Sequence, residues 1–192
     1  MKLPQLLASI LTATAFAAHA EISPIHLAVE LISKSDSKPA AKGQISYDHT
    51  QTRSLKIKVE NTSTQAVDGV VIKYWFLGHA MTGGGTKVIA SGERKATLGP
   101  RGKDLIESEV VSKQYTEAHS GATSGGKAGT AGKTSKVAAS GERILGYAVR
   151  AVKDGKVLTD YYSDTAYKAV IDASGAAAPA PAAAPGAKPA KK

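Results

Sequence analysis

The sequence contains no cysteine, so no disulfide, cysteine-based metal site or thiol nucleophile is available to the protein. Aromatic residues make up only 5% of the 192 residues, with one tryptophan and two phenylalanines. Acidic residues are also scarce, at 16 against 25 lysines and arginines, which gives a formal net charge of +9. These absences exclude thiol chemistry and soft-metal centres, and they make each large ring informative about the core or a contact surface.

Recognisable catalytic patterns are missing as well. No histidine after the N-terminal segment pairs with another histidine or a carboxylate at metal-ligand spacing: His26, His49, His79 and His119. No G-x-S-x-G elbow occurs, and the glycines at 83–85 fit neither G-x-x-x-x-G-K-[ST] nor a G-x-G-x-x-G between strand and helix. We therefore predict no catalytic residue, no metal and no cofactor. A hydrolase whose carboxylates converge only in the fold stays open as an alternative.

The N-terminus carries the one apolar run with the features of a targeting segment. Lys2 precedes an apolar stretch at 6–18, and Ala18-His19-Ala20 fits an A-x-A cleavage site. This pattern predicts a secretory signal peptide at 1–20. The run is shorter than the ~20 residues a membrane span needs. We expect an exported mature chain with no transmembrane span after cleavage, located in the periplasm, at the cell surface or in the medium.

Short alternating segments dominate the rest of the chain. Leu55, Ile57 and Val59 alternate with charged residues, and 70–77 is an apolar run bounded by glycines. We expect further strands at 25–32, 44–49, 87–90, 94–98, 104–112, 141–152 and 157–162, with turns at 50–53, 99–102 and 153–156. Residues 163–171 fit either a short helix or a last strand. The spacing predicts an all-β, antiparallel immunoglobulin-like or fibronectin-III-like sandwich.

Two segments are too poor in large apolar residues to form a core. Residues 113–140 are rich in glycine, serine, threonine, alanine and lysine, and 173–192 form an alanine, proline and lysine tail. We predict one sandwich domain at 21–172 with a flexible basic insertion at 113–140 and a disordered tail at 173–192. These segments supply the lysines that we consider as candidate polyanion contacts: Lys127, Lys133, Lys136, Lys188, Lys191 and Lys192.

The strand at 70–77 leaves two interpretations of the only tryptophan. Trp75 shares a face with Lys73, so it is either a partly exposed contact or, as we favour, buried with Lys73 extending to the rim. Tyr161 and Tyr162 are adjacent in a strand and point to opposite faces. We expect one of them to be core and the other a contact residue.

An ASGER pattern occurs twice, at 90–94 and 139–143, and we expect each copy to mark the same kind of entry into a strand. Asn61-Thr62-Ser63 matches the N-glycosylation pattern, but we interpret Asn61 as a turn residue.

Three blocks carry a family resemblance: 59–78 (VENTSTQAVDGVVIKYWFLG), 98–111 (LGPRGKDLIESEVV) and 146–158 (GYAVRAVKDGKVL). Together they resemble secreted immunoglobulin-like proteins of bacterial envelopes. They are loosely similar to FxLYD-type and late-embryogenesis-type sandwiches, which share the polar N-T-S bend before an aromatic-rich strand. The resemblance covers about 44–162. It implies a fold and a compartment, and it transfers no catalytic residue.

The leading functional hypothesis is an exported, non-enzymatic binding or scaffolding module of the bacterial cell envelope, with pilus or surface association as one option. Its partner would be an envelope protein or an anionic polymer, with Trp75, Tyr161 and Tyr162 as candidate contacts. The alternative is a polyanion binder, for acidic polysaccharide or nucleic acid, that uses the lysine-rich segments. We expect no specific nucleic-acid site, because no aromatic residues are interleaved with those lysines.

Overall fold

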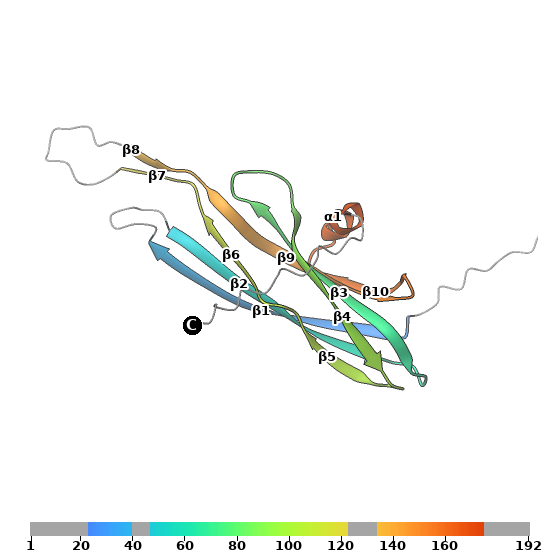
Figure 1. Cartoon of the computed structure of the whole chain (residues 1–192). Coiled ribbons are helices and arrows are strands. Elements are labelled where there is room, and N and C mark those ends of the chain that lie inside the picture. Colours follow the sequence, from blue (N-terminus) through green and yellow to red (C-terminus); the bar gives the residue numbers. More distant parts are fainter. Residues whose placement is uncertain (1–22, 40–46, 123–133, 175–192) are drawn as a thin grey trace, which may run out of the picture.

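The computed structural model describes residues 23–39, 47–122 and 134–174. The strands are β1 (Ile25–Pro39), β2 (Tyr47–Asn61), β3 (Val67–Ala80), β4 (Lys87–Leu98), β5 (Lys103–Glu107), β6 (Val111–Thr116), β7 (His119–Ala122), β8 (Thr134–Val137), β9 (Ser140–Lys153) and β10 (Lys156–Tyr162). One short helix, α1 (Tyr167–Ala173), follows them (Figure 1). The predicted all-β, antiparallel sandwich is confirmed, and 163–171 resolves into a turn and this helix.

The strands form two layers that join at one end of the molecule. One layer holds β1, β2, β5 and β6, and the other holds β10, β9, β3 and β4. Strand β6 pairs with β9 through Tyr115↔Gly141 and Thr116↔Ser140, which links both layers into the path β1-β2-β6-β9-β3-β4. Beyond this junction, β7 and β8 continue as a paired ribbon away from the sandwich (Figure 1).

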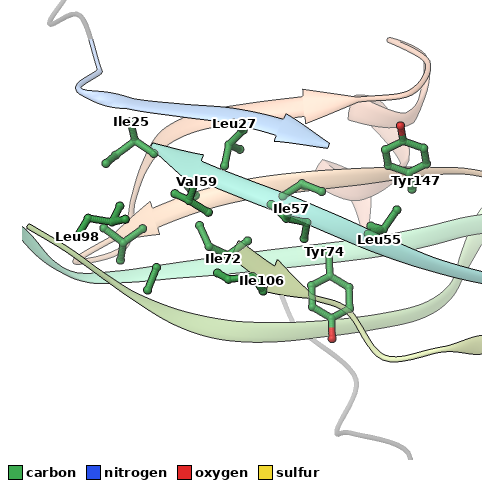
Figure 2. Packing of buried hydrophobic residues seen from close by; sticks show 14 of the residues in the cluster. Ile25, Leu27, Leu55, Ile57, Val59, Ile72, Tyr74, Leu98, Ile106 and Tyr147 are labelled. Atoms are coloured by element: carbon green, nitrogen blue, oxygen red, sulfur yellow. The ribbon is translucent and has the colours of Figure 1, made fainter. Parts of the chain in front are cut away.

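The main core lies between the two layers. The predicted apolar face of β2, Leu55, Ile57 and Val59, is fully buried there. It faces Ile72 and other inward residues of β3, β4 and β9 (Figure 2). Burying one such side chain stabilises a fold by roughly 1.5–3 kcal/mol. The period-2 pattern therefore identified the residues that hold the layers together.

The predicted turn at 50–53 is wrong, because β2 runs unbroken through these residues. Gln51 is buried, and its Oε1 accepts a hydrogen bond from the Ile144 backbone N–H at 2.9 Å. Polar residues in this half of β2 also pair with β1 and β6, so they need no exposed turn. The first strand is correspondingly longer than predicted and ends at Pro39, opposite Tyr47.

The predicted flexible insertion at 113–140 is also largely wrong in the part that the structure describes. Strands β6, β7 and β8 and the first residue of β9 occupy it, and the residues between Ala122 and Thr134 lie outside the described ranges. A ladder of backbone hydrogen bonds does not require large apolar side chains. Within the segment 113–140, the hydroxyl of Thr116, the last residue of β6, also donates to Asp48 Oδ1 of β2 at 2.6 Å.

Two other boundaries differ from the prediction. Strand β4 is continuous from 87 to 98, with Gly92 lying directly opposite Tyr74. The predicted strand at 104–112 is instead divided into β5 and β6 by a bend. There the Ser108 hydroxyl accepts a hydrogen bond from the Leu55 N–H at 2.8 Å. The Ser108 backbone N–H donates in turn to the Leu55 carbonyl at 2.9 Å, so both backbone groups of Leu55 stay paired where the chain leaves β2.

The remaining turns follow their sequence signals. Asp154 and Gly155 have φ of 51° and 78°, as the Asp-Gly hairpin predicted. The Gly102 N–H donates to the Gly99 carbonyl at 2.9 Å, which closes the turn predicted at 99–102. The interpretation of Asn61 as a turn residue is wrong, because Asn61 is the last residue of β2 and pairs with Ile25. It is fully buried, so its amide has no room for a glycan.

Candidate functional site

The described candidate residues fall into three separate places. Trp75 and Tyr162 lie on the outer face of the β10-β9-β3-β4 layer, near α1. Tyr161 lies on the inner face, where its ring stacks on that of Tyr147. Lys136 is exposed on the β7–β8 ribbon. The other candidate lysines, Lys127, Lys133, Lys188, Lys191 and Lys192, lie outside the described residues, as does the predicted signal peptide.

Trp75 is not an exposed contact residue, and the favoured buried interpretation is confirmed. It is 6% exposed and packs with Leu77, Ala148 and Ile171 of α1. The Arg150 guanidinium lies over its ring, 5.8 Å from the centroid. The sequence indicated that Trp75 is buried but not that α1 covers it, because the alternation within one strand does not reveal which element lies on its outer face.

Tyr162 belongs to a hydrogen-bonded network that joins α1 to the sheet. Its hydroxyl donates to Asp160 Oδ2 at 2.9 Å and accepts from Arg150 Nη2 at 2.6 Å. The same Nη2 donates to Asp172 Oδ1 of α1 at 2.9 Å. This bond lowers the pKa of Asp172, and burial raises the pKa of Tyr162. Tyr162 therefore has an evident structural role.

Tyr161 keeps a substantial exposed surface, 37%, although it lies on the core side of β10. Its ring centroid is 6.0 Å from that of Tyr147, with an interplanar angle of 12°. Tyr147 is buried, and burial, followed by the neighbouring Tyr161 hydroxyl, raises its pKa to about 12. Tyr161 thus extends the core outward at the side of the sandwich where β1 lies against β10.

Two exposed leucines lie beside Tyr147, the stacking partner of Tyr161, at this side. Leu31 of β1 and Leu145 of β9, which is 43% exposed, line a cavity of about 50 Å³ together with Tyr147. Arg53 lies at its edge and donates a hydrogen bond to Ser33. We call Leu31, Leu145, Tyr147 and Tyr161 the lateral patch. Three of the large apolar side chains that are exposed to solvent in the described residues are gathered here: Leu31, Leu145 and Tyr161.

A β-bulge creates this patch. Along β3 and β9, Leu77 pairs with Gly146 but Gly78 pairs with Ile144, so Leu145 is the extra residue. The bulge directs Ile144 into the core and leaves Leu145 in solvent. Simple alternation placed Leu145 on the same face as Tyr147, and it could not detect the bulge. Because bulges often reorient a side chain at a functional position, this one marks Leu145 as a candidate contact residue.

The edges of the sandwich are poorly suited to accept a strand from another protein. Register irregularities interrupt β4 and β10, and β5 is five residues long. The outer half of β1 carries Lys34, Lys38 and Pro39. Bulges, lysines, prolines and short strands are the features by which edges avoid pairing with other chains. Recognition by side-chain surfaces is therefore favoured over strand addition.

The ionic clusters within the described ranges have evident structural partners. Glu142 lies 2.7 Å from both Lys113 and Lys87, and these bonds, Lys113 first, lower its pKa to about 2. No group of three histidine, aspartate or glutamate side chains in the described chain could hold a metal ion. Across the same residues, no helix combines the length and hydrophobicity needed to cross a membrane.

Comparisons with known proteins add little to this geometry. No family model and no curated protein matches the sequence. A crystal structure from Akkermansia muciniphila aligns with 73% of this chain and 70% of its own, at 16% identity and a TM-score of 0.32. Because a TM-score this low supports no argument, the sandwich assignment depends on the strand ladders alone.

Proposed function

We propose that this protein is an exported, non-enzymatic binding module of a bacterial cell envelope and that it contacts a protein partner through the lateral patch. The β-bulge that turns Leu145 toward solvent, in one cavity with Leu31 and with the Tyr147 ring on which Tyr161 stacks, is the observation that carries this proposal. Export remains a prediction from residues 1–20.

The chemistry of the patch suits a protein partner. Leucine side chains and tyrosine rings offer apolar area, and the buried Tyr147 ring gives Tyr161 a rigid backing. A few such side chains around a small depression can dominate the free energy of binding, because burying each one on association contributes about 1.5–3 kcal/mol. The patch has no pair of carboxylates, so no observation there favours the hydrolase alternative.

The test is co-sedimentation of the full chain with isolated bacterial cell envelope over a salt series. Leu145→Ser and Tyr161→Ser alter the patch. Leu105→Ser and Tyr47→Ser make the same changes at exposed positions outside it, with Leu105 62% exposed on β5. We expect the patch variants to lose about tenfold or more in affinity, while the controls bind as the parent does.

Salt separates this proposal from polyanion binding. Attraction of lysines to an anionic polymer weakens steeply as salt rises, whereas apolar contacts do not. Binding that disappears at high salt and is equal in all four variants would contradict the patch proposal and favour the polyanion alternative.

A further inference from the structure

Helix α1 has little stability of its own. It contains seven residues, and isolated helices shorter than about 12–15 residues are marginal in water. Within the described chain it has no side-chain N-cap bond, no acidic residue in its first turn and no basic residue in its last. Its formation therefore depends on contacts with the sheet.

Those contacts are few. Ile171 is the buried side chain of α1, with Val170 and Tyr167 partly buried beside it. The ion pair between Arg150 and Asp172, at 2.9 Å, is the principal polar attachment. Lys168 lies 3.6 Å from both Asp160 and Asp172 at the exposed rim, where ion pairs contribute little.

The layer beneath α1 contains buried polar atoms whose hydrogen-bonding capacity is unused within the described residues. Ser91 Oγ and Arg150 Nε are buried, and neither has a hydrogen-bond partner in the part of the chain that is described. Unpaired buried polar atoms reduce the free energy gained when the helix docks. A groove of about 490 Å³ also continues beside α1, between Val170 and the first residues of β4, Lys87 and Val88.

The helix is also small relative to the layer it covers. Seven residues of α-helix span about 10 Å, whereas the 14 residues of β3 span about 46 Å. Beneath it lie Trp75, Leu77 and Ala148, an apolar surface that would face solvent if α1 moved away.

From these contacts we infer that α1 is a displaceable cover over a second binding face centred on Trp75. The occupant that replaces α1 is a partner helix with a carboxylate next to an apolar anchor. The anchor takes the position of Ile171, and the carboxylate takes that of Asp172, because without α1 the largely buried Arg150 guanidinium would keep the neutral Tyr162 hydroxyl as a partner but lose its carboxylate. This inference goes beyond the lateral patch and involves none of its residues.

The single tryptophan makes the opening of α1 measurable in the full chain. Ile171→Ser removes the buried anchor, and Ala169→Ser introduces the same residue at an exposed position of the same helix, as a control for the effect of serine on the helix itself. We expect acrylamide quenching of Trp75 to rise in the first variant and not in the second, with the β-sheet circular dichroism unchanged. The population with α1 undocked should increase about tenfold or more.

A second variant approaches the same interface from the strand. A methyl group at Gly146 would collide with the Tyr167 ring, which is the movable partner. Gly146→Ala should therefore also expose Trp75 while the sheet stays folded. In the parent protein, hydrogen exchange should be faster for α1 amides than for those of β3 and β9.

The occupant is tested with a blocked peptide of residues 163–174, added to the Ile171→Ser protein. A short flexible connection gives α1 an effective concentration in the millimolar range, so the peptide should restore quenching protection only at millimolar concentrations. The same peptide with Asp172→Lys should not restore it. Equal rescue by both peptides, or no rescue by either, would overturn the assignment of the occupant.

Two results would overturn the inference that α1 is a displaceable cover over Trp75. Trp75 could stay shielded in both variants while the sheet is folded, or its exposure could occur only together with loss of the sheet. Neither result would bear on the lateral patch, because envelope binding by the Leu145→Ser and Tyr161→Ser variants is measured separately.

Discussion

At the scale of single residues, one amide side chain organises the end of the sandwich. Asn61 Nδ2 donates to the carbonyls of Gln65 and Gly99, at 2.7 and 2.9 Å. Its Oδ1 accepts from the backbone N–H and the hydroxyl of Ser63, at 3.0 and 2.8 Å. The side chain is fully buried, so its removal would break these four hydrogen bonds together and leave a void at the end of the sandwich.

Asn61→Ala should therefore lower the free energy of unfolding by about 2–4 kcal/mol. Thr62→Ala is the matched control, because it removes one exposed hydrogen bond, from the Thr62 hydroxyl to Pro24 O at 3.0 Å, and should cost less than about 1 kcal/mol. Urea unfolding of the two variants measures the difference. Equal, small effects would show that the amide does not organise this turn.

The pH dependence of stability should report on Glu142. Its pKa falls from 4.5 to about 2 in the folded state, first through its bond to Lys113 and then through that to Lys87. A depressed carboxyl pKa stabilises the folded state above the unfolded value, and this contribution is lost as the pH falls from about 5 to 2.

Glu142→Gln should thus be about 1 kcal/mol less stable than the parent protein at pH 7, since water and salt screen this pair of lysines. The two proteins should converge in stability near pH 2. Urea unfolding at pH 7, 4 and 2.5 tests this expectation. A difference that stays constant across the series would contradict the assigned pKa.

At the scale of elements, the residue patterns predicted well which face of a strand is buried, and predicted bulges and covering elements poorly. The alternation of Leu55, Ile57 and Val59 identified the core face of β2, and Asp154-Gly155 identified the hairpin between β9 and β10. The cover over Trp75 and the outward turn of Leu145 were missed. Both depend on contacts between distant segments, and a bulge of one residue reverses every face beyond it.

The repeated ASGER pattern shows the same limit. The two copies do not both begin a strand, because 90–94 lies inside β4 whereas 139–143 spans the entry to β9. They share a different feature. Gly92 lies opposite Tyr74 and Gly141 lies opposite Tyr115, so each glycine faces a tyrosine across its ladder. This cross-strand relationship is invisible within either copy.

Gly141 provides a test of the junction between the layers. Its φ is +84°, and a Cβ there would collide with the Gln114 carbonyl oxygen. Gly141→Ala should destabilise the protein by about 2 kcal/mol or more. Gly155→Ala has a similar φ, +78°, but open space around it, and should cost about 1 kcal/mol.

Thermal unfolding of both glycine variants gives this comparison. Equal losses would mean that only the left-handed backbone conformation matters, and that the close approach of β6 to β9 contributes nothing.

At the scale of the whole molecule, the sandwich offers side-chain surfaces and protected edges. One surface, the lateral patch, is open in the described structure, and the other, around Trp75, is covered by α1. The layers join through β6 and β9, so both surfaces are carried by the same rigid strand β9. A partner that holds the patch would leave α1 free to open, since the two surfaces lie on opposite faces of this strand.

The absence of cysteine makes the central claim directly measurable. A Leu145→Cys variant and a Leu105→Cys variant each carry one exposed thiol, and maleimide modification is followed with and without isolated envelope at high salt. The account predicts that envelope slows modification of the Leu145→Cys variant several-fold and leaves that of the Leu105→Cys variant unchanged. Equal rates for both variants, while the protein is bound, would contradict the proposal that the lateral patch is the contact surface.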